Sequence, residues 1–166
     1  SFGGMVAAEV ASTIPHRVSK LVLLAPIGFW LDDHPVQDWM GMAPEKLNSL
    51  VFYDPDGPLA KEMTALPEEK GARDAAVVKA TWALACTGAF VWPLPDKGLK
   101  RRIHRATAPA LIVWGKQDRL VPPAYAQEFA SKLKDARVEL IDKAAHVPQL
   151  EQRKEVSSLV TKFLAS

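Results

Sequence analysis

The stretch Ser1-Phe2-Gly3-Gly4-Met5 stands directly before a run of small and aliphatic residues, and the interpretation of the whole sequence starts from it. A serine followed by small residues at the start of a helix is typical of a strained turn that pushes the serine hydroxyl out of the backbone. Larger neighbours would collide with an adjacent strand or helix. The stretch alone is weak evidence for such a turn, since a flexible glycine-rich N-terminus would have a similar sequence. The rest of the chain must distinguish the two interpretations.

The residues that follow this stretch predict a helix and then a buried strand. Over residues 3–14, Val6, Val10 and Ile14 recur at every fourth position with Ala7 and Ala11 beside them on the same face. We expect this face, with its alanines, to pack closely on a sheet. The continuous aliphatic run within residues 19–26 is typical of a parallel strand that is covered on both faces.

The last third of the chain alternates two further predicted strands with helices. Residues 109–114 and 137–141 are the strands, residues 122–133 form the helix between them, and a final helix starts at about 149 or 153 and ends near 164. Strands that alternate with helices in this way favour a parallel α/β sheet. The predicted fold class is therefore α/β, with three strands and flanking helices.

Between the first and second strands the composition changes. Residues 30–104 contain four of the five tryptophans, and residues 44–52 and 67–90 show helical spacing. The basic run at 99–105 predicts a short helix with a solvated charged face. Aromatic and methionine side chains at such density are typical of a core, and they also suit a helical insertion that covers a pocket.

Composition excludes several classes of partner. With 166 residues, 48% of them hydrophobic, the chain has enough apolar material for one core, and its net charge of +2 favours neither nucleic acid nor an anionic membrane. Cys86 is the single cysteine, so we expect a reducing compartment, the cytoplasm, and no internal disulfide. We expect no membrane span, because no apolar run approaches the about 20 residues that a span requires. We also expect no metal ion and no cofactor.

Two polar residues follow the ends of the last two predicted strands. Asp118 comes just after the strand at 109–114, and His146 just after the strand at 137–141. Open α/β sheets bind ligands at this edge. Taken singly, Asp118 is equally well a turn cap and His146 a loop histidine. Together with Ser1 they follow the order serine, acid, histidine, in which an imidazole takes the serine proton and a carboxylate stabilises the imidazolium.

The chain resembles the C-terminal half of a capped α/β-hydrolase, from the nucleophile turn onward. Four stretches carry the resemblance: Ser1-Phe2-Gly3-Gly4-Met5, Pro15-His16-Arg17-Val18 leading into Leu21-Val22-Leu23-Leu24, Val113-Trp114-Gly115-Lys116-Gln117-Asp118, and Ala145-His146-Val147-Pro148-Gln149-Leu150-Glu151. The resemblance implies that Ser1 is the nucleophile, His146 the general base and Asp118 the group that orients it, with the Phe2 backbone N–H in the oxyanion hole.

The resemblance also implies a division of the chain. Residues 1–29 and 105–166 would form part of the hydrolase core, and residues 30–104 a helical cap or lid. Large apolar side chains of that cap are the expected lining of an acyl or aryl pocket: Trp39, Met42, Phe52, Trp82, Phe90 and Trp92.

A serine nucleophile narrows the chemistry that the resemblance implies. It argues against the haloalkane dehalogenase and epoxide hydrolase branches, which use aspartate, and against the dienelactone branch, which uses cysteine. Hydrolysis of a small carboxylic ester and hydrolysis of a C–C bond next to a ketone both remain, with perhydrolase activity as a further possibility. We therefore expect an enzyme that is similar to serine carboxylesterases and acts on a small ester or ketone-type substrate.

The chain departs from the family because it starts at the nucleophile. Family members have earlier strands and a loop that donates a second oxyanion N–H, and loss of one such donor typically costs about 10²–10³ in rate. The strand near residues 20–25 would have an open edge. We expect either a missing N-terminal half or a homodimer through that edge. Two alternatives stay open: a non-catalytic binding module, and an N-terminal-nucleophile hydrolase in which the amine of Ser1 is the base.

Overall fold

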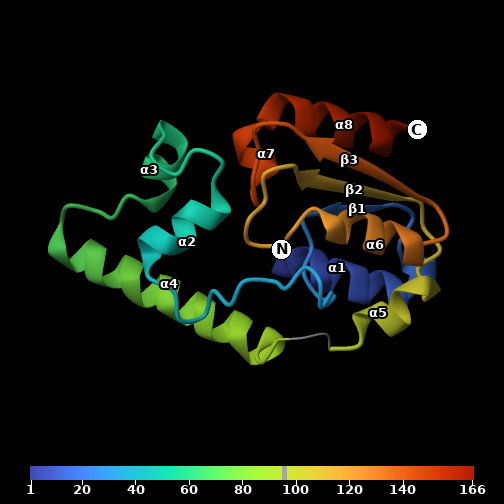
Figure 1. Ribbon diagram of the computed structural model, residues 1–166, viewed down its shortest axis with the longest axis horizontal. Coiled ribbons are helices and arrows are strands. Elements are labelled where there is room, and N and C mark those ends of the chain that lie inside the picture. The colour runs from blue at the N-terminus through green and yellow to red at the C-terminus, as the bar shows by residue number, and fades with distance from the viewer. Residues whose placement is uncertain (95–96) are drawn as a thin grey trace.

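A computed structural model describes residues 1–94 and 97–166 of the protein. Residues 95–96, which belong to the expected cap, lie outside the described residues. The described chain forms a three-stranded parallel sheet in the order β1-β2-β3, with helices on both faces and a helical insertion between β1 and β2 (Figure 1). The α/β fold class expected from the sequence is confirmed.

The three strands lie where the sequence predicts them. They are β1 (Leu21–Leu24), β2 (Ala110–Gly115) and β3 (Ala136–Ile141). Ala110 stands opposite both Leu21 and Ala136 in the register. All six residues of β2 are buried because it is the central strand and both of its faces are covered by helices.

The helices form two layers around the sheet. One face is covered by α1 and α6, and the other by α7 and α8 (Figure 1). The α-helices are α1 (Phe2–Thr13), α2 (Pro44–Val51), α3 (Pro58–Thr64), α4 (Lys70–Val91), α5 (Leu99–Arg102), α6 (Ala124–Lys132), α7 (Pro148–Glu151) and α8 (Arg153–Ala165), and short 3₁₀ turns occur at Pro15–Arg17 and Ile103–Arg105.

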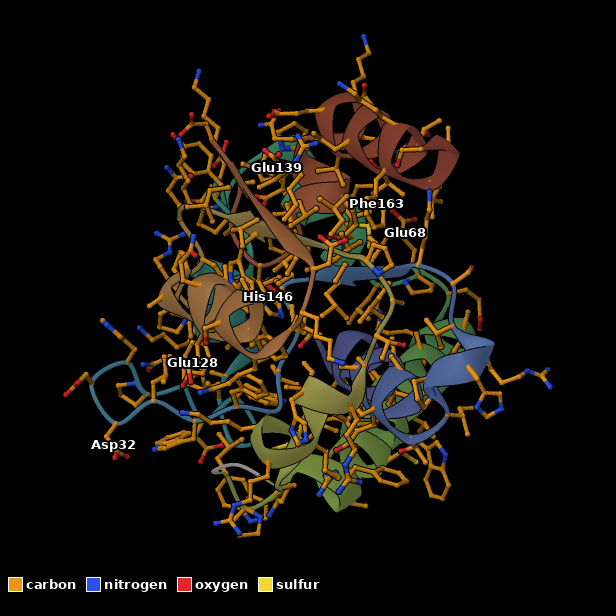
Figure 2. The ribbon with its side chains drawn as sticks, turned by 90° about the vertical axis from the view of Figure 1, so that its right-hand side faces the viewer. Asp32, Glu68, Glu128, Glu139, His146 and Phe163 are labelled. Atoms are coloured by element: carbon orange, nitrogen blue, oxygen red, sulfur yellow. The ribbon has the colours of Figure 1, made fainter. Side chains whose placement is uncertain are left out.

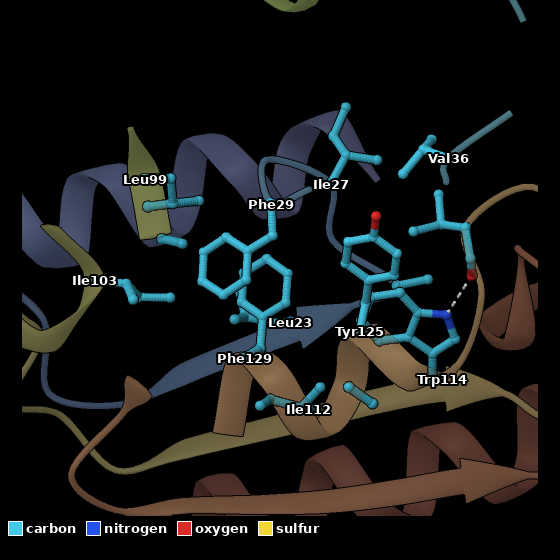
Figure 3. Close-up of a cluster of buried hydrophobic side chains, with 14 of the residues drawn as sticks. Leu23, Ile27, Phe29, Val36, Leu99, Ile103, Ile112, Trp114, Tyr125 and Phe129 are labelled. Carbon is cyan, nitrogen blue, oxygen red and sulfur yellow. Dashed lines mark hydrogen bonds between the residues drawn. The ribbon is translucent and has the colours of Figure 1, made fainter. Parts of the chain in front are cut away.

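The main core lies between the sheet and the layer of α1 and α6. The rings of Phe29 and Phe129 stack with their centroids 3.8 Å apart, next to Trp114 and Tyr125 (Figure 3). The Tyr125 hydroxyl accepts a hydrogen bond from the Leu31 N–H at 2.9 Å, and burial raises the pKa of this hydroxyl. A buried tyrosine with a satisfied hydroxyl links the segment after β1 to α6.

Ile112, in the middle of β2, is fully buried in this core. Shortening it in Ile112→Val removes one methylene from a close-packed site, so we expect the free energy of unfolding to fall by about 0.5–1.5 kcal/mol. Val78→Ala in the exposed part of α4 is the matched control, with a change within about 0.5 kcal/mol. Urea unfolding followed by far-UV circular dichroism measures both. An equal loss in the two variants would contradict this placement of the core.

The expectation about the inner face of α1 was right for Ala11, which is fully buried, and wrong for the larger residues. Val6, Val10 and Ile14 are all more than 40% exposed, and the buried residues of α1 are small: Ala8, Ala11 and Ser12. Ser12 is buried without penalty because its hydroxyl donates to the Ala8 carbonyl at 2.6 Å.

Close packing decides which face of α1 is buried. A Cβ at Gly4 would lie only 2.9 Å from the Cβ of Pro26, so only a helix face without bulk fits against the segment after β1. The larger apolar side chains of α1 therefore point outward. Together with Phe2, Met5 and Phe90 they line an open hollow of about 690 Å³. On the same side of the molecule, β1 pairs only with β2 in the described chain, so its other edge is open as expected.

The insertion is dominated by α4, which packs loosely on the rest of the chain (Figure 1). The Glu69 carboxylate caps its start by accepting the N–H groups of Gly71 and Ala72, which lowers the pKa of Glu69. Among the described residues, α4 is the one helix long and apolar enough to cross a membrane by length and composition. Core helices and signal sequences pass the same test, so the absence of a membrane span stays a prediction.

The insertion also contains α3, which lies between the two segments of predicted helical spacing, 44–52 and 67–90, and was not among the predicted helices. Pro58 occupies the first turn of α3, where a missing N–H costs no hydrogen bond, and Gly57 precedes it in an extended conformation.

Candidate active site

Ser1 lies at the start of α1, next to the carboxyl end of β1. Its amino group donates to the Leu24 carbonyl at 2.9 Å, and its own carbonyl accepts from the N–H groups of Met5 and Ile27. Figure 1 shows the N-terminus at the edge of the sheet toward which the strand arrows point. The Ser1 side chain makes no capping bond to α1 and the residue is exposed, so its hydroxyl is available at this edge.

The amino group of Ser1 lies against the carboxyl end of β1, where it donates to the Leu24 carbonyl. Burial lowers the pKa of this group from 8.0 to about 6, and the negative charge of Asp118 opposes that shift.

Asp118 is buried in a turn after β2 and accepts four hydrogen bonds. Oδ1 accepts from the backbone N–H groups of Leu120 and Val121 at 3.0 and 2.9 Å. Oδ2 accepts from the Trp114 indole at 3.0 Å and faces His146 Nδ1 at 2.8 Å. The turn that follows the strand thus supplies the donors that stabilise a buried carboxylate.

His146 lies in the loop after β3 and is 7% exposed; Figure 2 shows it near the centre of the molecule. Because a carboxylate only accepts, the contact with Asp118 assigns the proton of the neutral imidazole to Nδ1. The lone pair is then on Nε2, which is buried and has no hydrogen-bond partner in the described chain. This is the state in which a histidine is ready to take a proton from a hydroxyl.

The His146 loop passes very close behind the end of β2. A Cβ at Gly115 would lie 2.0 Å from the Ala145 carbonyl oxygen and 2.4 Å from that of Ala144. Only glycine permits this approach. Gly115 therefore allows the loop after β3 to approach the end of β2 closely, and this approach brings His146 to Asp118.

Phe2 has the position expected for an oxyanion donor. The first hydrogen bond of α1 joins the Met5 N–H to the Ser1 carbonyl, so the Phe2 N–H has no intrahelical acceptor. The Phe2 ring lies 5.8 Å from the ring of Phe90, at the end of α4. A free N–H at a helix start favours bound negative charge.

The six apolar residues expected to line one pocket do not meet in one cavity. Trp39 and Met42 line a hollow of about 480 Å³ against α4, Phe52 lines one of about 270 Å³ beside α7, and Phe90 lines the hollow on α1. The remaining two, Trp82 and Trp92, are 74% and 48% exposed. The resemblance implied that these residues share one pocket lining, whereas apolar composition carries no information on which face of the insertion each residue occupies.

Two charged residues near the site were given no role from the sequence. Glu151 accepts the Ala145 N–H at 2.7 Å, and Arg119 donates to the Phe52 carbonyl at 2.7 Å. In the sequence, the only signals for these roles were position: Glu151 follows His146 by five residues, and Arg119 comes directly after Asp118. Among residues 1–94 and 97–166, no group of three His, Cys, Asp or Glu side chains is arranged to hold a metal ion.

Comparison with protein families shows to which family the chain belongs. The model of the alpha/beta hydrolase family matches residues 1–159. The chain belongs to the alpha/beta hydrolase family. The α/β-hydrolase fold leaves no place for the N-terminal-nucleophile alternative, which requires a different fold.

Curated relatives of this alpha/beta hydrolase include enzymes of two kinds. It is 27% identical to pimeloyl-[acyl-carrier protein] methyl ester esterase of Aromatoleum aromaticum, with 96% of this chain and 70% of the relative covered. It is 26% identical to monoacylglycerol lipase ABHD6 of Homo sapiens, with 100% and 53% covered. It is 25% identical to 2-hydroxy-6-oxo-6-phenylhexa-2,4-dienoate hydrolase of Comamonas testosteroni, with 99% and 60% covered.

A solved structure supports the same fold. The hydrolase chain superimposes on 2-hydroxy-6-oxo-6-phenylhexa-2,4-dienoate hydrolase from Rhodococcus sp. strain RHA1 with a TM-score of 0.73 at 20% identity, covering 100% of this chain and 62% of that one. The chain thus spans between about half and two thirds of the length of most of these relatives.

Proposed function

We propose that this chain carries the catalytic residues of a serine hydrolase that cleaves a small carboxylic ester. Ser1 would be the nucleophile, His146 the general base and Asp118 the group that orients and stabilises it. One observation supports this most directly: the buried contact of 2.8 Å between Asp118 and His146 Nδ1, which leaves His146 Nε2 without a partner.

In the proposed reaction, Ser1 Oγ attacks the carbonyl carbon of the ester while His146 Nε2 takes the hydroxyl proton. The negative charge on the carbonyl oxygen is stabilised by the Phe2 N–H. The tetrahedral intermediate collapses, the C–O bond to the alcohol breaks, and His146 returns the proton to the leaving oxygen. A water molecule then cleaves the acyl-enzyme by the same steps, with Asp118 stabilising the imidazolium each time.

Hydrolysis of a C–C bond next to a ketone is the second candidate. It uses the same attack on a carbonyl, with the proton delivered to carbon instead of oxygen. The names of the relatives include both an ester hydrolase and a dienoate hydrolase, so they support hydrolysis without deciding between the two bonds. The specific substrate is part of the proposal.

We propose that residues 30–104 act as a cap and residues 1–29 and 105–166 as part of the hydrolase core. The contact between Phe90 and Phe2 brings the end of α4 next to the proposed nucleophile. Phe90 is therefore the residue of the expected pocket set that we place nearest the reacting atoms.

We further propose that other residues of the hydrolase fold cover the open edge of β1 and the hollow on α1. The relatives are longer than this chain, and these two surfaces adjoin each other. The covering residues would supply the second oxyanion donor, from a preceding N-terminal half. A second copy of the chain, paired along β1, is the alternative. The single, exposed Cys86 suits action in the cytoplasm.

Labelling with a fluorophosphonate tests the proposed nucleophile. We expect the folded chain to be labelled at Ser1, and Ser1→Ala and His146→Ala to abolish labelling, because the first lacks the attacking oxygen and the second its base. The matched control is Ser157→Ala on the exposed side of α8, which should label as the unaltered chain does. Mass spectrometry of the labelled peptide gives the site.

Labelling that survives in Ser1→Ala would contradict the assignment of the nucleophile. A folded chain that is not labelled at all would favour the non-catalytic binding module over the enzyme for this stretch of the protein.

A further inference from the structure

The end of α2 is joined by hydrogen bonds to both loops of the candidate site. The His146 N–H donates to the Val51 carbonyl at 2.9 Å. The Arg119 guanidinium donates to the Phe52 carbonyl at 2.7 Å. The Tyr53 N–H donates to Glu151 Oε1 at 2.5 Å. Three consecutive residues of the insertion, 51–53, are thus attached to the residues beside Asp118 and His146.

Glu151 is the centre of this attachment. Its second oxygen, Oε2, accepts the Ala145 N–H at 2.7 Å, so one half-buried carboxylate bridges the insertion and the residue before His146. Hydrogen bonds from backbone N–H groups to a carboxylate are charge-assisted and stronger than neutral ones. Glu151 makes no hydrogen bond to Asp118 or to the His146 ring. Its carboxylate is held instead by backbone N–H groups of Tyr53 and Ala145.

The short helix α7 places the Glu151 carboxylate under the His146 loop. Pro148 is buried and starts α7 directly after the loop, and one turn later the Glu151 side chain reaches back to the Ala145 N–H. The two consecutive N–H groups of Ala145 and His146 are then both held, one by Glu151 and one by Val51. With both groups held, the backbone that carries the imidazole has little freedom to rotate.

We infer that Glu151 is a positioning residue that fixes the His146 imidazole against Asp118 and couples its orientation to residues 51–53 at the base of the insertion. The inference rests on the proposed role of His146 as general base. A shift of residues 51–53 then moves the His146 loop, because the two share the Glu151 carboxylate and the Val51 carbonyl.

Two substitutions separate the effect of the Glu151 carboxylate from the effect of its side-chain length. In Glu151→Gln one carboxylate oxygen becomes an NH₂ group, which faces a backbone N–H and cannot accept from it. Glu151→Asp keeps both oxygens and the charge, but it is one methylene too short to span the two donors. The matched control is Glu155→Gln, an exposed glutamate in the first turn of α8.

The primary readout is the NMR signal of the His146 imidazole in the folded 166-residue chain, assigned by its loss in His146→Ala. We expect Glu151→Gln to move or broaden the Nδ1–H resonance. Glu151→Asp should do the same to a smaller extent, and Glu155→Gln should leave this resonance unchanged. A purely structural role would lower the melting temperature without changing the His146 signals of the folded protein.

The second readout is kinetic, with a short-chain p-nitrophenyl ester. We expect kcat to fall about 10- to 100-fold in Glu151→Gln with KM unchanged, because a misplaced base slows the chemical step without weakening substrate binding. Glu151→Asp should retain part of the activity, since it keeps the acceptor atoms.

The outcomes separate the inference from the function on which it rests. His146 signals that respond to Glu151→Gln in a chain without hydrolase activity would support the positioning role and refute the proposed reaction. Unaltered His146 signals in both folded Glu151 variants would overturn the inference, whether or not the chain is active. If Glu151→Gln does not fold, Glu151→Asp decides by the same two readouts.

Discussion

Asp118→Asn is expected to slow the fluorophosphonate labelling of Ser1 about 10⁴-fold, the loss that the same exchange causes in serine proteases. The asparagine fits the space, so the expected loss comes from the hydrogen-bonding pattern. Asp118 accepts four hydrogen bonds, two on each oxygen. An asparagine has one oxygen and must turn its NH₂ group toward one of these pairs of partners.

The geometry indicates which pair loses its acceptor. The backbone N–H groups of Leu120 and Val121 can only donate, whereas the Trp114 indole also donates to the Val121 carbonyl and the His146 ring can shift its proton. The amide oxygen therefore stays with the two backbone groups, and the NH₂ group faces Trp114 and His146. His146 then accepts through Nδ1 and carries its proton on Nε2. In that tautomer the ring has no lone pair for the Ser1 hydroxyl.

The measurement is the second-order rate constant of labelling, with Asp142→Asn as the control. Asp142 is an exposed aspartate whose contact is the ion pair with Lys116, so its exchange should change the rate little. A labelling rate in Asp118→Asn within tenfold of the unaltered chain would contradict the assigned role of Asp118.

Gly115→Ala is expected to separate His146 from Asp118. The added methyl would lie 2.0 Å from the Ala145 carbonyl oxygen, and this oxygen belongs to the backbone and cannot turn aside. The loop must move outward by more than an ångström. We expect labelling of Ser1 to fall at least about 10²-fold, and the free energy of unfolding to fall by about 1–3 kcal/mol from overpacking.

Two measurements on the folded variant check this: the labelling rate, and urea unfolding for the stability. Gly41→Ala is the matched control, because no atom lies within 4 Å of a Cβ at that position. Equal labelling of the Gly115→Ala variant and the unaltered chain would show that the His146 loop does not depend on its close approach to β2.

The features that the sequence predicted correctly are those with a strong local signal. Continuous aliphatic runs defined β1 and β2, because a central strand such as β2, covered on both faces, is apolar at every position. β3 contains Arg137 and Glu139, and it was located by its place in the alternation of strands and helices. The places of Asp118 and His146 followed from one further rule: residues just past the ends of adjacent parallel strands lie at one edge of the sheet. Their contact at 2.8 Å agrees with that rule.

The features that sequence analysis missed depend on what packs where. Helical periodicity located an apolar face on α1 at Val6 and Val10, but the close approach to Pro26 selects the face of small residues for the sheet. Likewise, a glutamate six residues after Ala145 gives no sign of its hydrogen bond to that residue, since the bond depends on a turn of helix folding back. Long-range packing, which no local pattern encodes, decided both.

The distribution of the site along the chain has a consequence for the order of folding. Asp118 and His146 follow the two strands of one unit, β2-α6-β3, and are separated by 28 positions. Ser1 comes to the same edge only once β1 pairs with β2, and this pairing closes a loop that contains the whole insertion. Closing a longer loop costs more chain entropy, and contacts between distant residues form more slowly. Asp118 and His146 therefore belong to a part of the molecule that assembles through contacts closer in sequence, and Ser1, the proposed nucleophile, joins them from a greater distance along the chain.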